Sequence, residues 1–194
     1  MKSIKDTLLI VKDAIDRYSI ETRTKAYAAL IGGHAAVFFG AERTTLDVDI
    51  CFHAVEKQPG ISFFRFLQKH LPPRYAVRII EATKDPSDPL RHDLIIIDDT
   101  EKEYPHIDIL LARYQWEILG LEQADFIQGL DFAVMPAPYL IAMKLMAGGR
   151  KDELDILDLL RDLPEQDLAT IKDLAKRIGK DRALQSLLNE RSRS

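Results

Sequence analysis

The sequence predicts an α+β protein, close to α/β, in which helices flank a mixed β-sheet and a helical lobe follows at the C-terminal end. Short apolar runs of strand length alternate with amphipathic segments over the first two thirds of the chain. After residue 135 every apolar pattern has the spacing of a helix. A glycine pair, Gly32-Gly33, separates an apolar run from a helical one, as at a strand–helix turn. We therefore predict a core over residues 1–135 and a helical lobe over 136–194 that packs on it.

The periodicity of the apolar residues places the elements in order. Helical spacing predicts helices over 3–18, 34–40, 61–70 and 116–121 in the core, and over 139–147, 153–160, 168–178 and 183–188 in the lobe. Short apolar or alternating runs bounded by turn residues predict strands over 26–31, 46–52, 75–82, 94–98, 106–111 and 126–134. A loop with two prolines is predicted over 83–90.

Composition and charge are those of an ordinary globular protein. Hydrophobic residues make up 46% and charged residues 30%, and 27 basic against 31 acidic side chains give a net charge of −4. This balance argues against a broad basic surface that coats nucleic acid. The single cysteine, Cys51, excludes an internal disulfide and suits a reducing compartment. No apolar run approaches the ~18 residues of a membrane span, and the first residues lack the apolar core of a signal peptide, so we expect a cytoplasmic protein with no membrane partner.

Three aspartates are the candidate catalytic and metal-binding residues. Asp47 and Asp49 are two positions apart on a predicted strand, so their carboxylates share one face, which is either a metal site or simply solvent-facing. Asp108 is the only acid in the apolar strand 106–111, where an uncompensated carboxylate is costly to bury. If the two strands are neighbours, the three acids form a cluster that suits one or two Mg²⁺ ions. Asp108, which lies apart from the pair, could also accept a proton from an attacking hydroxyl.

Candidate phosphate ligands flank the first two acids. Gly32 and Gly33 would let the backbone approach a phosphate closely, and the next helix would direct N–H groups at it. Arg43 and Thr44 offer guanidinium and hydroxyl donors, or belong to an ordinary turn. His34, at the predicted helix start, could donate to a phosphate or cap the helix.

A second basic group lies in the predicted helical lobe. Lys144 is the lone cation of an apolar helix, so it needs a partner if it is buried. That partner could be a triphosphate, or an acid of the next helix, where Asp152 and Asp155 share a face. Arg150 and Lys151 follow the glycine turn between these helices and are free to reach a ligand.

In order and spacing, these segments resemble the nucleotidyltransferase superfamily with the polymerase-beta-like minimal fold, and within it a bacterial branch of small AbiEii-type proteins. The resemblance covers residues 25–53 and 136–160, and the middle only through Asp108. It depends on four segments: Ile31-Gly32-Gly33-His34-Ala35, Arg43-Thr44-Thr45-Leu46-Asp47-Val48-Asp49, Lys144-Leu145-Met146-Ala147 and Arg150-Lys151-Asp152-Glu153-Leu154-Asp155. Many superfamily members have Gly-Ser at the turn, whereas this chain has Gly33 followed by His34, which could alter how a nucleotide is held.

The resemblance implies a Mg²⁺-dependent enzyme that transfers a nucleoside monophosphate from an NTP to an acceptor hydroxyl and releases pyrophosphate. It implies that Asp47, Asp49 and Asp108 hold the metal. The acceptor could be a tRNA end, a protein side chain or a small molecule, and some members of the branch are toxins paired with an antitoxin protein. The alternative is a non-catalytic module that binds a nucleotide or a partner protein on the same fold.

Overall fold

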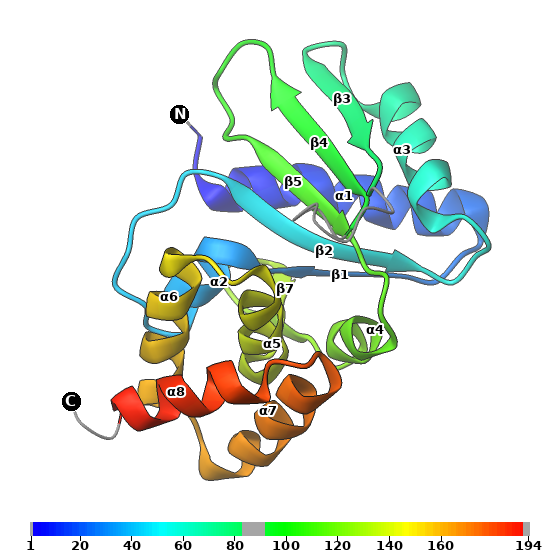
Figure 1. Ribbon diagram of the computed structural model, residues 1–194. Helices are drawn as coiled ribbons and strands as arrows, with labels where there is room; N and C mark the ends of the chain where they lie inside the picture. The colour runs from blue at the N-terminus through cyan, green and yellow to red at the C-terminus, as the bar shows by residue number, and fades with distance from the viewer. Residues whose placement is uncertain (1, 83–91, 192–194) are drawn as a thin grey trace.

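The computed structural model describes residues 2–82 and 92–191. In these ranges one mixed seven-stranded sheet has the order β3-β4-β5-β2-β1-β7-β6, and helices flank it (Figure 1). The strands are β1 (Ala26–Leu30), β2 (Val48–Ala54), β3 (Tyr75–Ile80), β4 (Leu94–Asp99), β5 (Ile107–Leu111), β6 (Asp125–Ile127) and β7 (Phe132–Val134). The helices are α1 (Ile4–Thr22), α2 (Gly32–Phe38), α3 (Pro59–His70), α4 (Gln115–Glu122), α5 (Ala137–Ala147), α6 (Arg150–Arg161), α7 (Glu165–Arg177) and α8 (Asp181–Arg191). The predicted α+β class is confirmed.

The central strand β2 decides where the acids lie. It pairs antiparallel with β1 and parallel with β5, and the parallel register sets Asp49 beside Asp108. Val48, Ile50 and Phe52 point to the opposite face and are buried, as the alternation of the sequence predicts. On that face Phe52 stacks on Phe63 of α3, with ring centroids 4.1 Å apart. Asp49 therefore lies on the other face of β2, away from the aromatic core under α3.

The C-terminal helices pack on the aspartate-bearing side of the molecule. Helix α5 contacts α2, α6 and α7, and one continuous cluster of buried apolar residues joins these helices to the sheet. Figure 1 shows α5, α6, α7 and α8 gathered together below β1. The division into a core over 1–135 and a helical lobe over 136–194 that packs on it remains a prediction. No helix in the described ranges has both the length and the apolar content needed to cross a membrane.

Several boundaries differ from the prediction for local reasons. Strand β2 begins at Val48, so Asp47 lies in a bend before it rather than on the strand. The predicted strand over 126–134 is two antiparallel strands, because Gly129 and Asp131 adopt positive φ angles (102° and 56°) and reverse the chain between them. Helix α2 begins at Gly32 rather than at residue 34. The loop predicted over 83–90 lies outside the described residues.

Candidate functional site

The glycine turn lies directly against Asp49. Gly32 has a φ of +63°, and a Cβ atom at this position would lie 1.9 Å from Oδ2 of Asp49. The backbone N–H of Gly33 donates a hydrogen bond to the same carboxylate, and the N–H of Ile31 donates to the Asp49 carbonyl (2.9 Å). The turn between β1 and α2 therefore approaches the acid as closely as a glycine permits.

We expect Gly32→Ala to reduce the free energy of unfolding by about 2–4 kcal/mol, because it combines a left-handed backbone with a collision at Asp49. Gly179→Ala is the matched control, since Gly179 has a similar φ of +68° and nothing within 4 Å of its added Cβ. The control should cost only about 1 kcal/mol. Urea unfolding of both variants measures the difference. Equal losses in the free energy of unfolding would show that the collision with Asp49 does not contribute to the destabilisation.

The surroundings of Asp49 disfavour its charged form. Burial, and next the nearby negative charge of Asp108, raise the pKa of Asp49 from 3.8 to about 6, although the Gly33 N–H opposes the shift. Two further charges make smaller contributions, Asp47 raising the pKa of Asp49 and Lys144 lowering it. The charge of Asp49 is therefore only partly compensated.

This pKa shift predicts a pH dependence of stability. Because the folded pKa lies above the unfolded one, the stabilising contribution of the protonated group is complete below pH ~4 and is lost as the pH rises through about 6. The loss should be on the order of 3 kcal/mol. It should appear as a change with pH in the stability difference between wild type and Asp49→Asn, measured by urea unfolding from pH 4 to pH 8. A difference that stays constant over this range would contradict the prediction.

Asp108 belongs to a chain of hydrogen-bonded side chains that the sequence did not reveal. Nε2 of His106 lies 2.9 Å from Oδ1 of Asp108, and Nδ1 lies 2.6 Å from Oδ1 of Asp98 at the end of β4. Burial alone would lower the pKa of His106, but the hydrogen bond to Asp98 and the charge of Asp108 outweigh it and raise the pKa. His106 therefore fixes one oxygen of Asp108. The spacing of two between His106 and Asp108 is the one sequence signal that could have suggested this contact.

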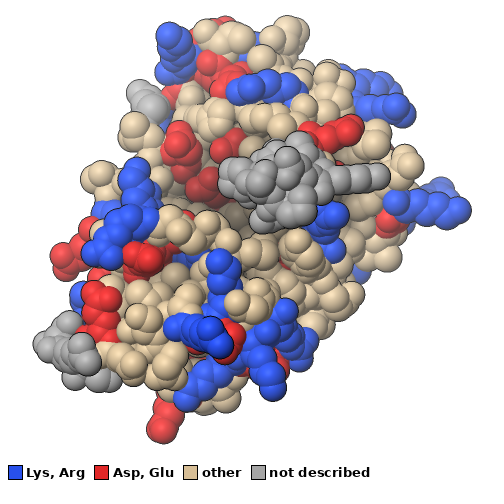
Figure 2. All heavy atoms as spheres, viewed as in Figure 1, with Lys and Arg blue, Asp and Glu red and all other residues tan. Residues whose placement is uncertain are grey.

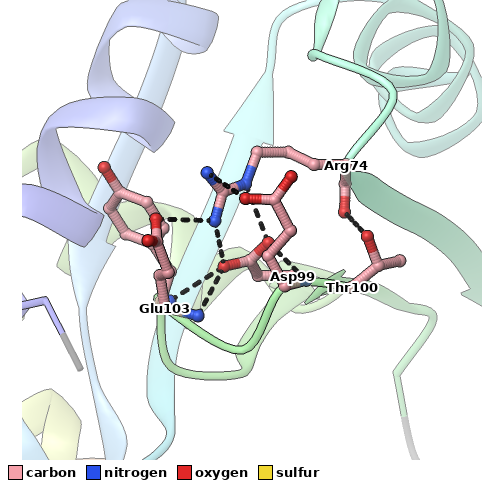
Figure 3. Close-up of polar contacts among 6 residues, drawn as sticks. Arg74, Asp99, Thr100 and Glu103 are labelled. Atoms are coloured by element: carbon pink, nitrogen blue, oxygen red, sulfur yellow. Dashed lines mark hydrogen bonds and ion pairs between the residues drawn. The ribbon is translucent and has the colours of Figure 1, made fainter.

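A partly buried ion pair between Arg74 and Asp99 fixes the connection from β4 to β5 that leads to His106 (Figure 3). Arg74 donates to both oxygens of Asp99, with Nε–Oδ1 at 2.9 Å and Nη2–Oδ2 at 2.7 Å. Asp99 also accepts backbone N–H groups of Glu101, Glu103 and Tyr104. The Arg74 guanidinium and these N–H groups hold the pKa of Asp99 well below its ordinary value despite burial. The turn that precedes His106 is thus anchored to the start of β3.

Asp47 is less enclosed than the other two acids. It is exposed in the bend before β2. Burial, and next the positive charge of Arg43, lower the pKa of His34, and the charge of Asp47 opposes this shift without reversing it. Within the described residues, no three or more His, Cys, Asp or Glu side chains are arranged so that together they could hold a metal ion. The structure brings Asp49 and Asp108 together in register and leaves Asp47 at the edge of the site.

A cavity of about 350 Å³ adjoins Asp49 and collects most of the predicted phosphate ligands. Six of the predicted catalytic and ligand-binding residues line it, namely Gly32, Gly33, Arg43, Asp49, Lys144 and Lys151, and so does Asp152. Thr44 lines an adjacent cavity together with Arg43 and Lys151. Arg150 lines neither of these two cavities, and its side chain is 72% exposed and pairs with Glu153 at 2.9 Å. His34 and Asp108 do not line the cavity around Asp49.

Lys144 forms an ion pair with Asp155. The Oδ2 atom of Asp155 lies 2.5 Å from Lys144 Nζ and 2.7 Å from Arg43 Nη1, and Asp152 adds a longer contact of 3.5 Å to Lys144. The acid of the next helix is therefore the partner of this buried lysine. Asp155 joins α6 both to α5 and to the segment before β2. Figure 2 shows acidic side chains gathered on this face, where the sheet meets the C-terminal helices.

Comparisons with known proteins support the fold. No protein-family model and no curated protein matches the sequence. Among solved structures, the chain is similar to an antigenic nucleotidyltransferase-like protein from Paracoccidioides brasiliensis, with 16% identity, a TM-score of 0.50, and coverage of 96% of this chain and 92% of the other. It is also similar to ANT(2")-Ia in complex with adenylyl-2"-tobramycin, with 13% identity, a TM-score of 0.43 and coverage of 96% and 98%. The first likeness shows that this chain has the fold of a nucleotidyltransferase-like protein.

Proposed function

We propose that the protein is a Mg²⁺-dependent nucleotidyltransferase that moves a nucleoside monophosphate from an NTP to an acceptor hydroxyl. The observation that carries the proposal is the pairing of Asp49 with Asp108 on adjacent parallel strands, with Asp49 held against the Gly32-Gly33 turn. A carboxylate pair beside a turn that offers backbone N–H groups combines a cation site with a phosphate site.

The residues fit a divalent cation. Burial, and next the negative charge of Asp108, raise the pKa of Asp49, so a bound cation would relieve an electrostatic cost that this carboxylate already carries. Asp49 and Asp108 would hold it, and we propose Asp47, in the bend before β2, as the third ligand. Mg²⁺ commonly takes one or two carboxylates and fills its other positions with phosphate oxygens and water. When bound, it would neutralise charge on the triphosphate.

The remaining groups of the site have roles in binding and proton transfer. The Gly33 turn, Arg43 and Lys151 would hold the triphosphate, and no ion pair involves Lys151 in the described part of the chain. In the transfer, the acceptor oxygen forms a bond to the α-phosphorus, and the bond to the pyrophosphate oxygen breaks. The proton of the acceptor hydroxyl passes to Asp108, which His106 keeps in one orientation. Positioning and charge neutralisation supply most of the rate enhancement.

The proposal also covers the family branch, the location and the partners of the protein. We place the chain in the AbiEii-type branch and in the cytoplasm, and we propose that it binds a second Mg²⁺ ion. The acceptor would be a tRNA end, a protein or a small molecule, and an antitoxin protein would be a partner if the chain acts as a toxin. The segments around Gly32-Gly33 and Arg150-Lys151 support this placement.

Thermal unfolding with each of the four NTPs, with and without Mg²⁺, tests donor binding. An NTP at a hundred times its Kd should add ~2.7 kcal/mol of stability, a rise of roughly 5–10 °C for a chain of this size. The rise should require Mg²⁺ and should disappear in Asp47→Asn/Asp49→Asn. No rise with any NTP, or an equal rise in the double variant, would contradict the proposal. Binding without release of pyrophosphate, even with acceptor pools of RNA, proteins and small molecules, would favour the non-catalytic module.

A further inference from the structure

A second cavity, of about 560 Å³, lies at the other ends of α2 and α5 from the glycine turn. Its wall is mainly apolar and includes Phe38 at the end of α2, Tyr139 in the first turn of α5, and Leu159 and Leu163 of α6 and the segment after it. It shares no residue with the cavity around Asp49. The apolar wall is partly open, since Phe38 is 43% exposed. This cavity has no part in the chemistry proposed above.

The cavity adjoins an open edge of the sheet. Strand β6 is last in the strand order and pairs only with β7 among the described strands. Its alternate residues Asp125 and Ile127 line the cavity, while Phe126 between them is 60% exposed. An extended segment that added to β6 would therefore direct every second side chain over the cavity, because side chains alternate between the faces of a sheet. An edge strand of this kind offers unpaired backbone groups for such an addition.

The rim of the cavity is acidic. Asp125, Asp162 and Asp167 line it, none of the described lining residues is Lys or Arg, and no ion pair in the described ranges involves these three acids. Asp167 lies in the first turn of α7, where the helix dipole favours an acid. Asp162 follows the last residue of α6, where the dipole disfavours one. The local helix structure therefore does not account for the acid at residue 162.

We propose that β6 and this cavity form a docking site for an extended segment of a partner protein, with an apolar side chain flanked by Lys or Arg. The edge would supply backbone hydrogen bonds, the cavity would take the apolar side chain, and the acids would pair with the flanking cations. A second copy of this chain is a poorer occupant, because it would bring the same three acids to the contact. The inference is independent of the proposed nucleotidyl transfer.

Two labelled peptides test the site on the full chain by fluorescence anisotropy. The first is acetyl-Lys-Thr-Phe-Thr-Leu-Thr-Lys-amide, and the second has Glu in place of both lysines. We expect the lysine peptide to bind about tenfold more tightly, a difference of about 1.4 kcal/mol. Methylation of its alternate backbone nitrogens should weaken binding by a similar factor of about ten, because it removes the strand hydrogen bonds. Binding should also slow amide hydrogen exchange at residues 125–127.

Charge-neutral variants locate the contact. Asp125→Asn/Asp162→Asn should reduce the preference for the lysine peptide to about threefold or less. Asp13→Asn/Asp16→Asn on α1 removes the same charge elsewhere and should leave the preference unchanged. Both pairs are exposed, so folding is not at risk. Equal affinity for the two peptides, no binding of the lysine peptide at ~1 mM, or equal effects of the two variant pairs would overturn the proposal. So would dimerisation of the chain through β6, seen by sedimentation and lost in Asp125→Asn/Asp162→Asn.

Discussion

Replacing Asp49 with Asn is expected to lower the rate of nucleotidyl transfer by about a thousandfold or more and to leave the protein at least as stable at neutral pH. The loss corresponds to about 4 kcal/mol of transition-state stabilisation, the scale expected when a carboxylate that holds a catalytic metal is neutralised. Stability should not fall, because the variant removes a charge that burial and Asp108 already disfavour. Pyrophosphate release under saturating Mg-NTP measures the first effect, and urea unfolding measures the second.

Asp173→Asn is the control for this variant. Asp173 lies on α7, far along the chain from the site, with a side chain 57% exposed and paired with Arg177. Its neutralisation should change neither the transfer rate nor the stability by more than a small amount. If Asp49→Asn retains wild-type activity, the carboxylate pair is not the catalytic centre and the proposed mechanism is wrong.

Replacing Asp155 with Asn should have the largest effect on stability, a loss of about 3–5 kcal/mol in the free energy of unfolding. The carboxylate is 5% exposed, and one of its oxygens contacts both Lys144 and Arg43. Neutralising it leaves Lys144, whose side chain is also 5% exposed, with only the longer contact to Asp152. A buried cation without its partner carries the full cost of its desolvation.

Glu153→Gln on the same helix is the matched control. The Arg150–Glu153 pair has a similar distance of 2.9 Å, but its side chains are 72% and 45% exposed. Its loss should change the unfolding free energy by no more than about 0.5 kcal/mol. Chemical unfolding of both variants compares a buried pair with an exposed one. Similar losses in the free energy of unfolding from the two substitutions would show that burial does not determine how much the Asp155 contacts contribute to stability.

The fold class could be predicted because apolar periodicity is a local property of the chain. The alternation over Val48, Ile50 and Phe52 predicts their burial, and the helical spacing after residue 135 predicts the C-terminal helices. The division of 126–134 into two strands was missed, because a reversal at Gly129 and Asp131 depends on backbone angles that apolar periodicity does not report. The start of β2 was placed two residues too early for a related reason, since Leu46 continues the alternation although it is 67% exposed.

The site was predictable in its residue types but not in its contacts. Asp49 and Asp108 could be named from their sequence context, and their proximity followed only if the two strands were neighbours, which the register now establishes. The contact of Asp98 with His106 depends on the pairing of β4 with β5, so no local pattern encodes it. For Lys144, the sequence left a triphosphate and an acid of the next helix as equal alternatives, and the packing of α6 on α5 decides for Asp155.

The register between β2 and β5 has a consequence for folding. Asp49 and Asp108 are separated by 59 positions in the chain (108 − 49), yet they are direct neighbours across parallel strands. Parallel pairing over such a separation requires closure of a long loop, which is entropically expensive and slow compared with the formation of local helices. A slip of one residue would turn Asp108 to the other side of the sheet. A partly folded chain can therefore have its helices and the antiparallel β1–β2 pair, but it acquires the paired carboxylates only when β5 joins the sheet in its final alignment.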